Sequence, residues 1–351
     1  MQTKPILCVL AGAAVALAGA AAQAQDAQGS AGQFYAGRTM DMMIGADPGG
    51  GFDIYARLFA KHMGHHIAGK PTIVPKNLPG AGSNKTAQFI YAQAPKDGSV
   101  MGAVFSGAII QPLLGDPKAV QHDSTKLIYL GSANNEVGIT VIRADAPVQS
   151  FKDLFSKEMI SAASASGGSS RDFPSVLNNV LGTKINLVTG YPGTKEMSLA
   201  IERNEVQGTG GYLWSSLKTQ NPDWLNPAKM KIIVQEAIKG NAELTKMGVP
   251  VAIDFAKTAE DKQVMELFYG QLVFGRPYIL PPGTPTDRVK LLRAAFMETA
   301  KDRAFLEDAA KARLEVDPVS GDEVQALVAK MFGAPENIIA RAKEAMIYKK
   351  P

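Results

Sequence analysis

The spacing of apolar residues changes along the chain between short continuous runs and a helical repeat. This alternation predicts strands and helices in turn. Short apolar runs at 39–45, 71–77 and 100–106 are typical of buried strands. The stretches at 51–63 and 83–94 instead repeat their apolar positions at helical spacing. Strands and helices that alternate with short connections predict a parallel sheet covered by helices on both faces.

The same alternation restarts near residue 139, with apolar runs at 139–145, 184–190 and 231–237. The last third of the chain has mainly helical periodicity, with helix starts expected at Thr286, Ser320 and Pro335. We therefore predict an α/β protein with two lobes, each a mainly parallel sheet flanked by helices, between which the chain crosses more than once. The predicted division assigns 37–139 and 274–351 to lobe 1 and 140–273 to lobe 2.

The first 24 residues predict a secretory signal peptide. Lys4 precedes an alanine-rich apolar stretch that ends in Ala22-Gln23-Ala24, a small-residue cleavage pattern. The apolar stretch is shorter than a bilayer span. We expect cleavage near Ala24, export to the periplasm and a disordered leader at 25–36. Cleavage removes Cys8, the one cysteine, so the exported chain cannot rely on disulfides.

Composition narrows the function classes. Hydrophobic residues make up 46% of the chain and charged residues 20%, which allows a substantial core. The 37 Lys and Arg against 33 Asp and Glu give a net charge of +4, too little for a nucleic-acid surface. No second long apolar segment follows the signal peptide, so we expect a soluble product.

Three glycine-rich turns follow predicted strands and open predicted helices, at 48–53, 77–86 and 164–173. In open α/β sheets, ligands bind beyond the carboxyl ends of the strands, where helix N-termini expose unpaired N–H groups that favour anions. The second turn imitates a phosphate-binding loop, but Pro79 and Asn84 stand where that motif requires glycine. The three turns therefore indicate a carboxylate site rather than a nucleotide site.

Asp53 and several aromatic residues leave alternatives open. A carboxylate in the first helical turn stabilises the helix end, which is the favoured role of Asp53. The other interpretation is that Asp53 pairs with the ammonium group of an amino-acid-like ligand. Aromatic residues in the predicted ligand loops suggest a ligand with an apolar body; they are Phe52, Phe105, Tyr191, Tyr212 and Trp214.

Nothing in the sequence predicts a metal, a cofactor or catalysis. His62, His65 and His66 cluster at a helix end without a neighbouring acidic or cysteine ligand, and no H-E-x-x-H motif occurs. Ser169 and Ser170 follow glycines but do not form a G-x-S-x-G elbow. A Ser-His-acid triad assembled from distant positions is a less favoured alternative.

The motifs resemble, in order along the chain, those of the periplasmic solute-binding proteins of tripartite tricarboxylate transporters, the Bug family. The resemblance rests on PGGGFDIYAR at 48–57, NLPGAGS at 77–83, PKDGS at 95–99, GYPGTKEM at 190–197 and LPPGTPTDRVKLL at 280–292. It implies a Venus-flytrap fold that closes on a small organic carboxylate and delivers it to a large and a small membrane subunit. We also expect a monomer.

The resemblance further implies the site residues. The first half of the site would be lined by Gly50, Gly51, Asp53, Gly80, Ala81 and Gly82, and the second half by Gly168, Ser169, Ser170, Tyr191 and Gly193. Leu78 and Ser83 depart from the family pattern, which often has Arg and Gly there, so the identity of the acid stays open. Two other functions are also consistent with the sequence: a sensory protein that presents its ligand to a signalling receptor, and a secreted hydrolase.

Overall fold

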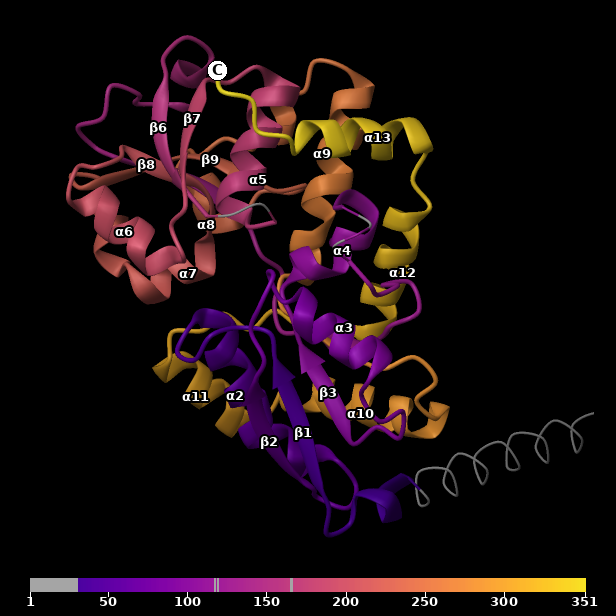
Figure 1. Ribbon diagram of the computed structural model, residues 1–351. Helices are drawn as coiled ribbons and strands as arrows, with labels where there is room; N and C mark the ends of the chain where they lie inside the picture. Colours follow the sequence, from indigo (N-terminus) through magenta and orange to yellow (C-terminus); the bar gives the residue numbers. More distant parts are fainter. Residues whose placement is uncertain (1–30, 117, 119, 165–166) are drawn as a thin grey trace, which may run out of the picture.

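The computed structural model describes residues 31–116, 118, 120–164 and 167–351, so the predicted signal peptide lies outside the described residues. Within them the chain forms two lobes, each built on one sheet (Figure 1). The first sheet contains, in spatial order, β11 (Val319–Ser320), β4 (Ile128–Ser132), β10 (Pro277–Leu280), β3 (Val100–Ala103), β1 (Thr39–Ile44) and β2 (Thr72–Asn77). The second contains β7 (Ile185–Thr189), β6 (Met159–Ala163), β8 (Gly208–Leu213), β5 (Gly138–Arg143) and β9 (Met230–Glu236).

Both sheets are mixed, which confirms the predicted two-lobed α/β fold but not the expectation that each sheet is mainly parallel: β1–β2, β1–β3, β6–β7 and β6–β8 are parallel pairs, and the other five pairs are antiparallel. In the first sheet β1 pairs in parallel with β2 and β3, and β10 is inserted antiparallel between β3 and β4. In the second sheet β6 pairs in parallel with β7 and β8, and β5 lies antiparallel between β8 and β9. The reversed strands β5 and β10 are the first strands that the chain forms after it crosses from one lobe to the other.

Helices cover both faces of each sheet. The first-lobe helices are α2 (Gly51–Met63), α3 (Asn84–Ala92), α4 (Ser106–Leu114), α10 (Thr286–Thr299), α11 (Arg303–Lys311) and α12 (Gly321–Phe332). The second-lobe helices are α5 (Ser169–Val176), α6 (Thr194–Glu202), α7 (Trp214–Gln220), α8 (Ala242–Lys246) and α9 (Ala259–Tyr269). The helix starts predicted at Thr286, Ser320 and Pro335 are confirmed by α10, α12 and α13 (Glu336–Ala345).

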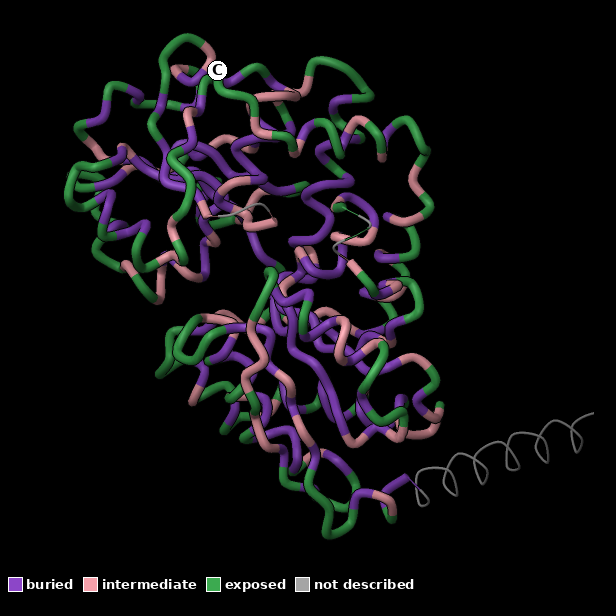
Figure 2. The backbone as a smooth tube through the Cα atoms, in the orientation of Figure 1, coloured by how far each residue is buried: buried purple, intermediate pink, exposed green. Residues whose placement is uncertain are grey.

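Buried positions run through both lobes (Figure 2), and the apolar residues among them form three clusters. One lies under α2, α10 and α11, and another under α6 and α7. The third extends from Ile109 of α4 in the first lobe to Phe268 of α9 in the second. The two lobes therefore share buried apolar surface on one side of the molecule.

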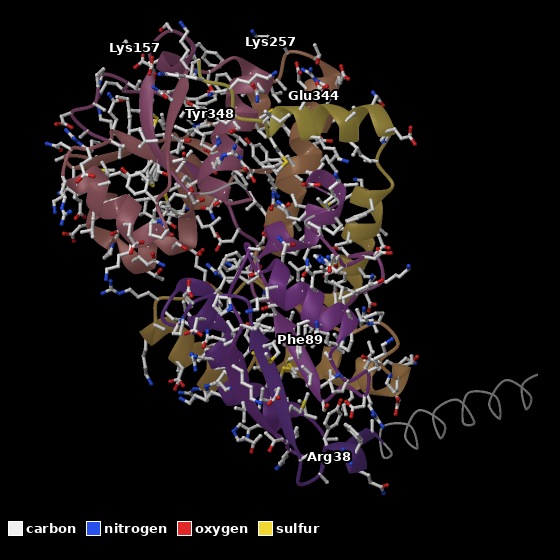
Figure 3. All side chains as sticks on the ribbon, in the orientation of Figure 1. Arg38, Phe89, Lys157, Lys257, Glu344 and Tyr348 are labelled. Atoms are coloured by element: carbon white, nitrogen blue, oxygen red, sulfur yellow. The ribbon has the colours of Figure 1, made fainter. Side chains whose placement is uncertain are left out.

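Two predictions about the chain ends need correction. Residues 31–35, expected in a disordered leader, are helical, with Ala31 and Tyr35 fully buried and the Tyr35 hydroxyl donating to the Gly98 carbonyl at 3.1 Å. The end of the chain, assigned to the first lobe, packs on the second: α13 lies against α9, and Tyr348 lies beside β7 (Figures 1 and 3).

Two segments that connect the lobes are hydrogen-bonded to each other, one around residues 134–136 and one that runs from the 3-10 helix Gly270–Phe274 to Gly275. The Gly275 N–H donates to the Asn134 carbonyl at 3.2 Å, and the Glu136 N–H donates to the Leu272 carbonyl at 2.8 Å. A Cβ on Gly275 would lie 2.4 Å from Cγ of Glu136, so only glycine fits there. We refer to this paired crossing between the lobes as the hinge segment. Among the described residues, no helix is both long and apolar enough to cross a membrane.

Candidate functional site

The turn from β1 into α2 leaves the first backbone N–H groups of the helix open. Gly50 is the N-cap residue, and no side chain caps the helix. The Ile54 N–H is the first to bond within the helix, to the Gly50 carbonyl at 3.0 Å. Such open N–H groups at a helix N-terminus attract an anion.

Asp53 is held inside its own lobe. Its carboxylate accepts from the Gly49 N–H, from Nε of Arg57 and from Nδ2 of Asn77, each at 2.8 Å, and the side chain is buried. Burial alone would raise the pKa of the carboxyl, but Arg57, the Gly49 N–H and Asn77 together hold the pKa below its usual value. These contacts give Asp53 a structural role at the helix end, the favoured interpretation of the sequence.

The turn from β2 into α3 has four consecutive residues with positive φ, from Gly80 at 141° through Ala81 and Gly82 to Ser83 at 71°. Among the described residues, no backbone carbonyl accepts from the N–H groups of Ala81 and Gly82. The Ser83 hydroxyl does not cap α3. It donates instead to the Gly45 carbonyl at 2.7 Å and accepts from the Phe105 N–H at 3.0 Å. Ser83 thus connects the turns that follow β1, β2 and β3.

The turn from β6 into α5 places the two candidate serines against their own lobe. The Ser169 hydroxyl donates to the Gly211 carbonyl at 2.7 Å, and the Ser170 oxygen accepts from the Ser164 N–H at 3.0 Å. The helix begins after Gly168 without a side-chain cap. Burial raises the pKa of Asp172 to about 6, although the Gly167 N–H and Arg171 oppose this shift. The open donors of this turn are therefore backbone groups rather than the two hydroxyls.

The turn from β7 into α6 carries Tyr191 and Gly193 beside the α5 turn, because β7 pairs in parallel with β6. Gly193 is the N-cap residue of α6, again without a side-chain cap. Tyr191 is half-buried and packs against the second-lobe core. Its turn belongs to the same sheet edge as Gly168, Ser169 and Ser170.

The glycine turns of the two lobes face each other. A Cβ on Gly82 of the first lobe would lie 3.9 Å from the Gly167 carbonyl oxygen of the second, and one on Gly107 would lie 3.5 Å from it. A second contact region joins α2 to α7, where a Cβ on Gly51 would lie 3.7 Å from Nε2 of Gln220. Lys218 of α7 also forms an ion pair with Glu315 of the first lobe. Of the predicted residues, Gly51 and Gly82 therefore lie beside the other lobe, at two places along the interlobe contact.

Arg276, which no sequence motif indicated, lies in the hinge segment at the second of these places. It is 3% exposed, and its Nη2 donates to the Ser215 hydroxyl at 3.0 Å and to the buried carboxylate of Glu136 at 3.4 Å. One signal in the sequence was available. Arg276 is the only charged residue between Glu266 and Asp287.

The candidate aromatic residues divide into two groups. The Phe52 and Phe105 rings meet at a centroid distance of 4.2 Å beside the first-lobe turns. Tyr212 and Trp214 are buried, and the Tyr212 hydroxyl accepts from Asn221. The latter pair belongs to the second-lobe core.

The histidines and serines do not assemble into a catalytic site in the part of the chain that the structure describes. His62 and His66 contact Asp308 and Asp302 respectively, whereas His122 contacts the Ala108 carbonyl. No group of three or more potential metal ligands occurs among residues 31–116, 118, 120–164 and 167–351.

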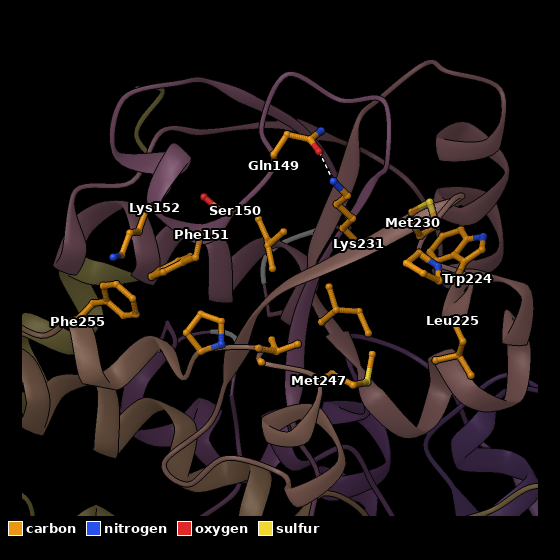
Figure 4. Close-up of a pocket in the computed structure, with 16 residues that line it drawn as sticks. Gln149, Ser150, Phe151, Lys152, Trp224, Leu225, Met230, Lys231, Met247 and Phe255 are labelled. Atoms are coloured by element: carbon orange, nitrogen blue, oxygen red, sulfur yellow. Dashed lines mark hydrogen bonds between the residues drawn. The ribbon is translucent and has the colours of Figure 1, made fainter.

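A cavity of about 440 Å³ opens elsewhere, on the surface of the second lobe beside β9 (Figure 4). It is lined by apolar residues such as Met230, Met247 and Phe255, and Lys231 donates across it to Gln149. None of the predicted site residues lines it.

Comparison with known proteins identifies the fold. No family model matches the chain, and no curated protein matches it in sequence. Solved structures do match. The periplasmic binding protein BugD is 20% identical with a TM-score of 0.64, over 89% of this chain and 98% of its own. A R. palustris protein solved with adipate is 17% identical with a TM-score of 0.65, over 87% and 97%.

A third match is MatC from Rhodopseudomonas palustris with bound malate, at 17% identity and a TM-score of 0.61, over 89% of this chain and 99% of its own. The chain therefore has the two-lobed fold of these periplasmic binding proteins along almost their whole length.

Proposed function

We propose that this chain is an extracytoplasmic solute-binding protein that captures a small organic carboxylate between its lobes and delivers it to a tripartite tricarboxylate-type membrane transporter. The observation that carries the proposal is which of the described α-helices have glycine at the N-cap. Helices α2, α5 and α6, which follow the predicted ligand turns, begin after glycine and lack a side-chain cap. Four other helices, α8, α9, α11 and α12, are capped by Asn241, Thr258, Asp302 and Ser320.

Side-chain caps stabilise a helix by about 0.5–2 kcal/mol. The chain uses them on these four helices. Five further helices, α3, α4, α7, α10 and α13, also lack a side-chain cap, but among the described α-helices only α2, α5 and α6 have glycine at the N-cap, where no side chain covers the first N–H groups. An uncapped N-terminus offers several N–H donors and a partial positive charge, which suit a carboxylate. Such ends on α2 of the first lobe and on α5 and α6 of the second favour an anionic ligand with several acceptor oxygens. The adipate and malate bound to two structures of the same fold are ligands of this class.

The internal bonds of Asp53 favour acids over amino acids as ligands. Its two oxygens already accept three hydrogen bonds within the first lobe. Its side chain is only 3% exposed, so little of the carboxylate is left for the ammonium group of a ligand. We therefore expect simple carboxylates to bind better than amino acids of the same length.

The test is a thermal-unfolding screen of the purified protein against mono-, di- and tricarboxylates, aromatic acids and amino acids. A ligand that binds only the native state at about 100 times its Kd stabilises it by about 2.7 kcal/mol. We expect at least one carboxylate to raise the melting temperature and its diamide to have no effect.

Two variants at Gly50 test whether the ligand binds at the start of α2. Gly50→Asp is the test variant and Gly50→Ala is its control. Gly50 has φ −77° and ψ 163°, an ordinary N-cap conformation, and the nearest atom to an added Cβ is the Asp47 carbonyl oxygen at 3.6 Å. An Asp side chain there accepts from the first N–H groups of α2, so Gly50→Asp should abolish the ligand effect while Gly50→Ala keeps most of it. A panel without any stabilising acid would refute the proposed function.

A further inference from the structure

Arg276 is a buried cation that lies over two aromatic rings of the first lobe. Its guanidinium carbon lies 4.3 Å from the Phe52 ring centroid and 4.2 Å from that of Tyr55, both on α2. Such stacking fixes the plane of the guanidinium group and leaves its edges for hydrogen bonds.

The hydrogen bonds of Arg276 are incomplete. Nη2 donates to Ser215 and Glu136, whereas Nε and Nη1 have no hydrogen-bond partner among the described residues. Glu136 does not supply the missing acceptors for Nε and Nη1. Its Oε1 accepts from Asn134 and Ser215 as well as from Nη2 of Arg276. A buried charged donor without an acceptor is costly, and native proteins leave few of them.

Gly51 lies beside the open edge of this guanidinium group. A Cβ on Gly51 would lie 3.6 Å from Nη2 and 3.7 Å from Nη1 of Arg276, and 3.7 Å from Nε2 of Gln220. All three distances are ordinary van der Waals contacts, and the φ of Gly51 is not among the positive ones, so the backbone does not require glycine. The missing side chain leaves a place surrounded by nitrogen donors from the hinge segment, α7 and the start of α2.

We propose that this place, bounded by Arg276, Gly51 and Gln220, receives a carboxylate group of the ligand, with Arg276 as its charged partner. The inference rests on the proposed function and adds a specificity-determining residue to it. A carboxylate accepts from Nη1 and from the open N–H groups of α2 together, which supplies the missing acceptor. Gln220 and Ser215 come from the second lobe, so a carboxylate bound here also connects the lobes.

Gly51→Asp tests the inference without any ligand, because it attaches a carboxylate to the same place. Relative to the isosteric Gly51→Asn, it should lower the unfolding equilibrium constant by on the order of tenfold or more, as expected for a charge-assisted hydrogen bond to a buried group. An acidic group at a helix N-terminus alone accounts for about two- to fivefold. The control position is Thr194, the first residue of α6. The difference in stability between Thr194→Asp and Thr194→Asn gives the helix-end effect alone.

Urea unfolding of the four variants gives the comparison. Equal Asp-to-Asn effects at positions 51 and 194 would overturn the inference, whatever ligand is found. A larger effect at position 51 that disappears in the Arg276→Gln/Glu136→Gln background, where both buried charges are removed together, would support it.

The ligand measurement separates this inference from the proposed function. If an acid from the panel binds the wild type and Gly51→Asp abolishes its binding, both are supported. If Gly51→Asp retains wild-type affinity in calorimetry, the inference fails and the proposed function stands. If no acid binds but the Asp-to-Asn effect at position 51 still exceeds that at position 194, the donor-lined place is supported and the proposed function fails.

Discussion

Ser83 shows how one side chain positions the first-lobe turns. Its φ of 71° is unfavourable for any residue except glycine, yet the side chain is buried and both its hydrogen bonds cross to other turns. A Cβ on Gly45 would lie 2.5 Å from the Ser83 hydroxyl, so Gly45 has to be glycine for Ser83 to reach its carbonyl. The hydroxyl offsets the backbone strain by holding three turns in one arrangement.

We predict that Ser83→Ala lowers the free energy of unfolding by about 2–3 kcal/mol. It leaves the Gly45 carbonyl and the Phe105 N–H without their partner and keeps the strained φ. Ser83→Gly should cost about 1 kcal/mol less than Ser83→Ala, because glycine removes the strain. Urea unfolding at neutral pH measures both, and an alanine variant as stable as wild type would contradict the assigned role.

The sequence could predict the turn but not this connection. The glycines at 80 and 82 and the strand-to-helix position indicated a tight turn, and Ser83 was identified as a departure from the family pattern. That its hydroxyl reaches Gly45 and Phe105 depends on how three strands end side by side. Arg276 was missed for a similar reason, because its partners Glu136 and Ser215 are 140 and 61 residues away.

At the scale of elements, β9 supports the second-lobe turn through Glu236. This carboxyl is fully buried, and it accepts from the Thr140 hydroxyl of β5 and from the Gly211 N–H of β8. The Gly211 carbonyl in turn accepts from Ser169 at the start of α5. Burial raises the pKa of Glu236 to about 7, against the bonds from Thr140 and Gly211.

We predict that Glu236 makes the protein less stable as the pH rises. The raised pKa means that the folded state holds this proton more tightly than the unfolded state, so the stabilisation is complete below about pH 4.5 and is lost as the pH rises through about 7. Glu236→Gln, which mimics the protonated form, should match wild type near pH 4.5 and exceed it by about 3 kcal/mol at pH 8. Urea unfolding at both pH values measures the free energy of unfolding of wild type and variant. If the difference between the two free energies is the same at both pH values, the prediction is wrong.

The sequence predicted those elements well that have an apolar pattern of their own over several residues. It predicted those strands poorly that form only by pairing with residues far away in the sequence. The strands at β1, β2, β3 and β5 were expected, whereas β4 and β10 were not. The β10 segment begins with Pro277 and has only four residues, which gives no strand signal of its own. It becomes a strand because the chain returns from the second lobe between β3 and β4, a tertiary effect that local pattern does not contain.

At the scale of the whole molecule, the chain crosses between the lobes three times. The first crossing leads from β4 to β5, the second from Gly275 and Arg276 into β10, and the third from α12 to α13. The sequence indicated more than one crossing but not the third. An amphipathic pattern at 336–345 predicts a helix without revealing which lobe its apolar face contacts.

The third crossing ends on the edge of the second sheet. The Tyr348 hydroxyl accepts from the Leu187 N–H of β7 at 2.9 Å and donates to Asn186 at 3.0 Å, while Asn179 donates to the carbonyls of Ala345 and Ile347. Because β7 is an edge strand, its outward N–H groups depend on such partners for protection from solvent. The chain end therefore belongs functionally to the second lobe, as a cover for the strand that leads into the Tyr191 turn.

We predict that Tyr348→Phe accelerates amide hydrogen exchange in β7, most at Leu187, while exchange in the first-lobe strands stays unchanged. The variant keeps the ring in place and removes only the hydroxyl, so local opening of the edge becomes easier without global unfolding. A chain that lacks residues 349–351 but keeps Tyr348 is the matched control and should exchange like wild type. Exchange at Leu187 that stays at the wild-type rate in Tyr348→Phe would show that another group protects this edge. If the control accelerates as much as Tyr348→Phe does, the protection comes from the terminal residues rather than from the hydroxyl.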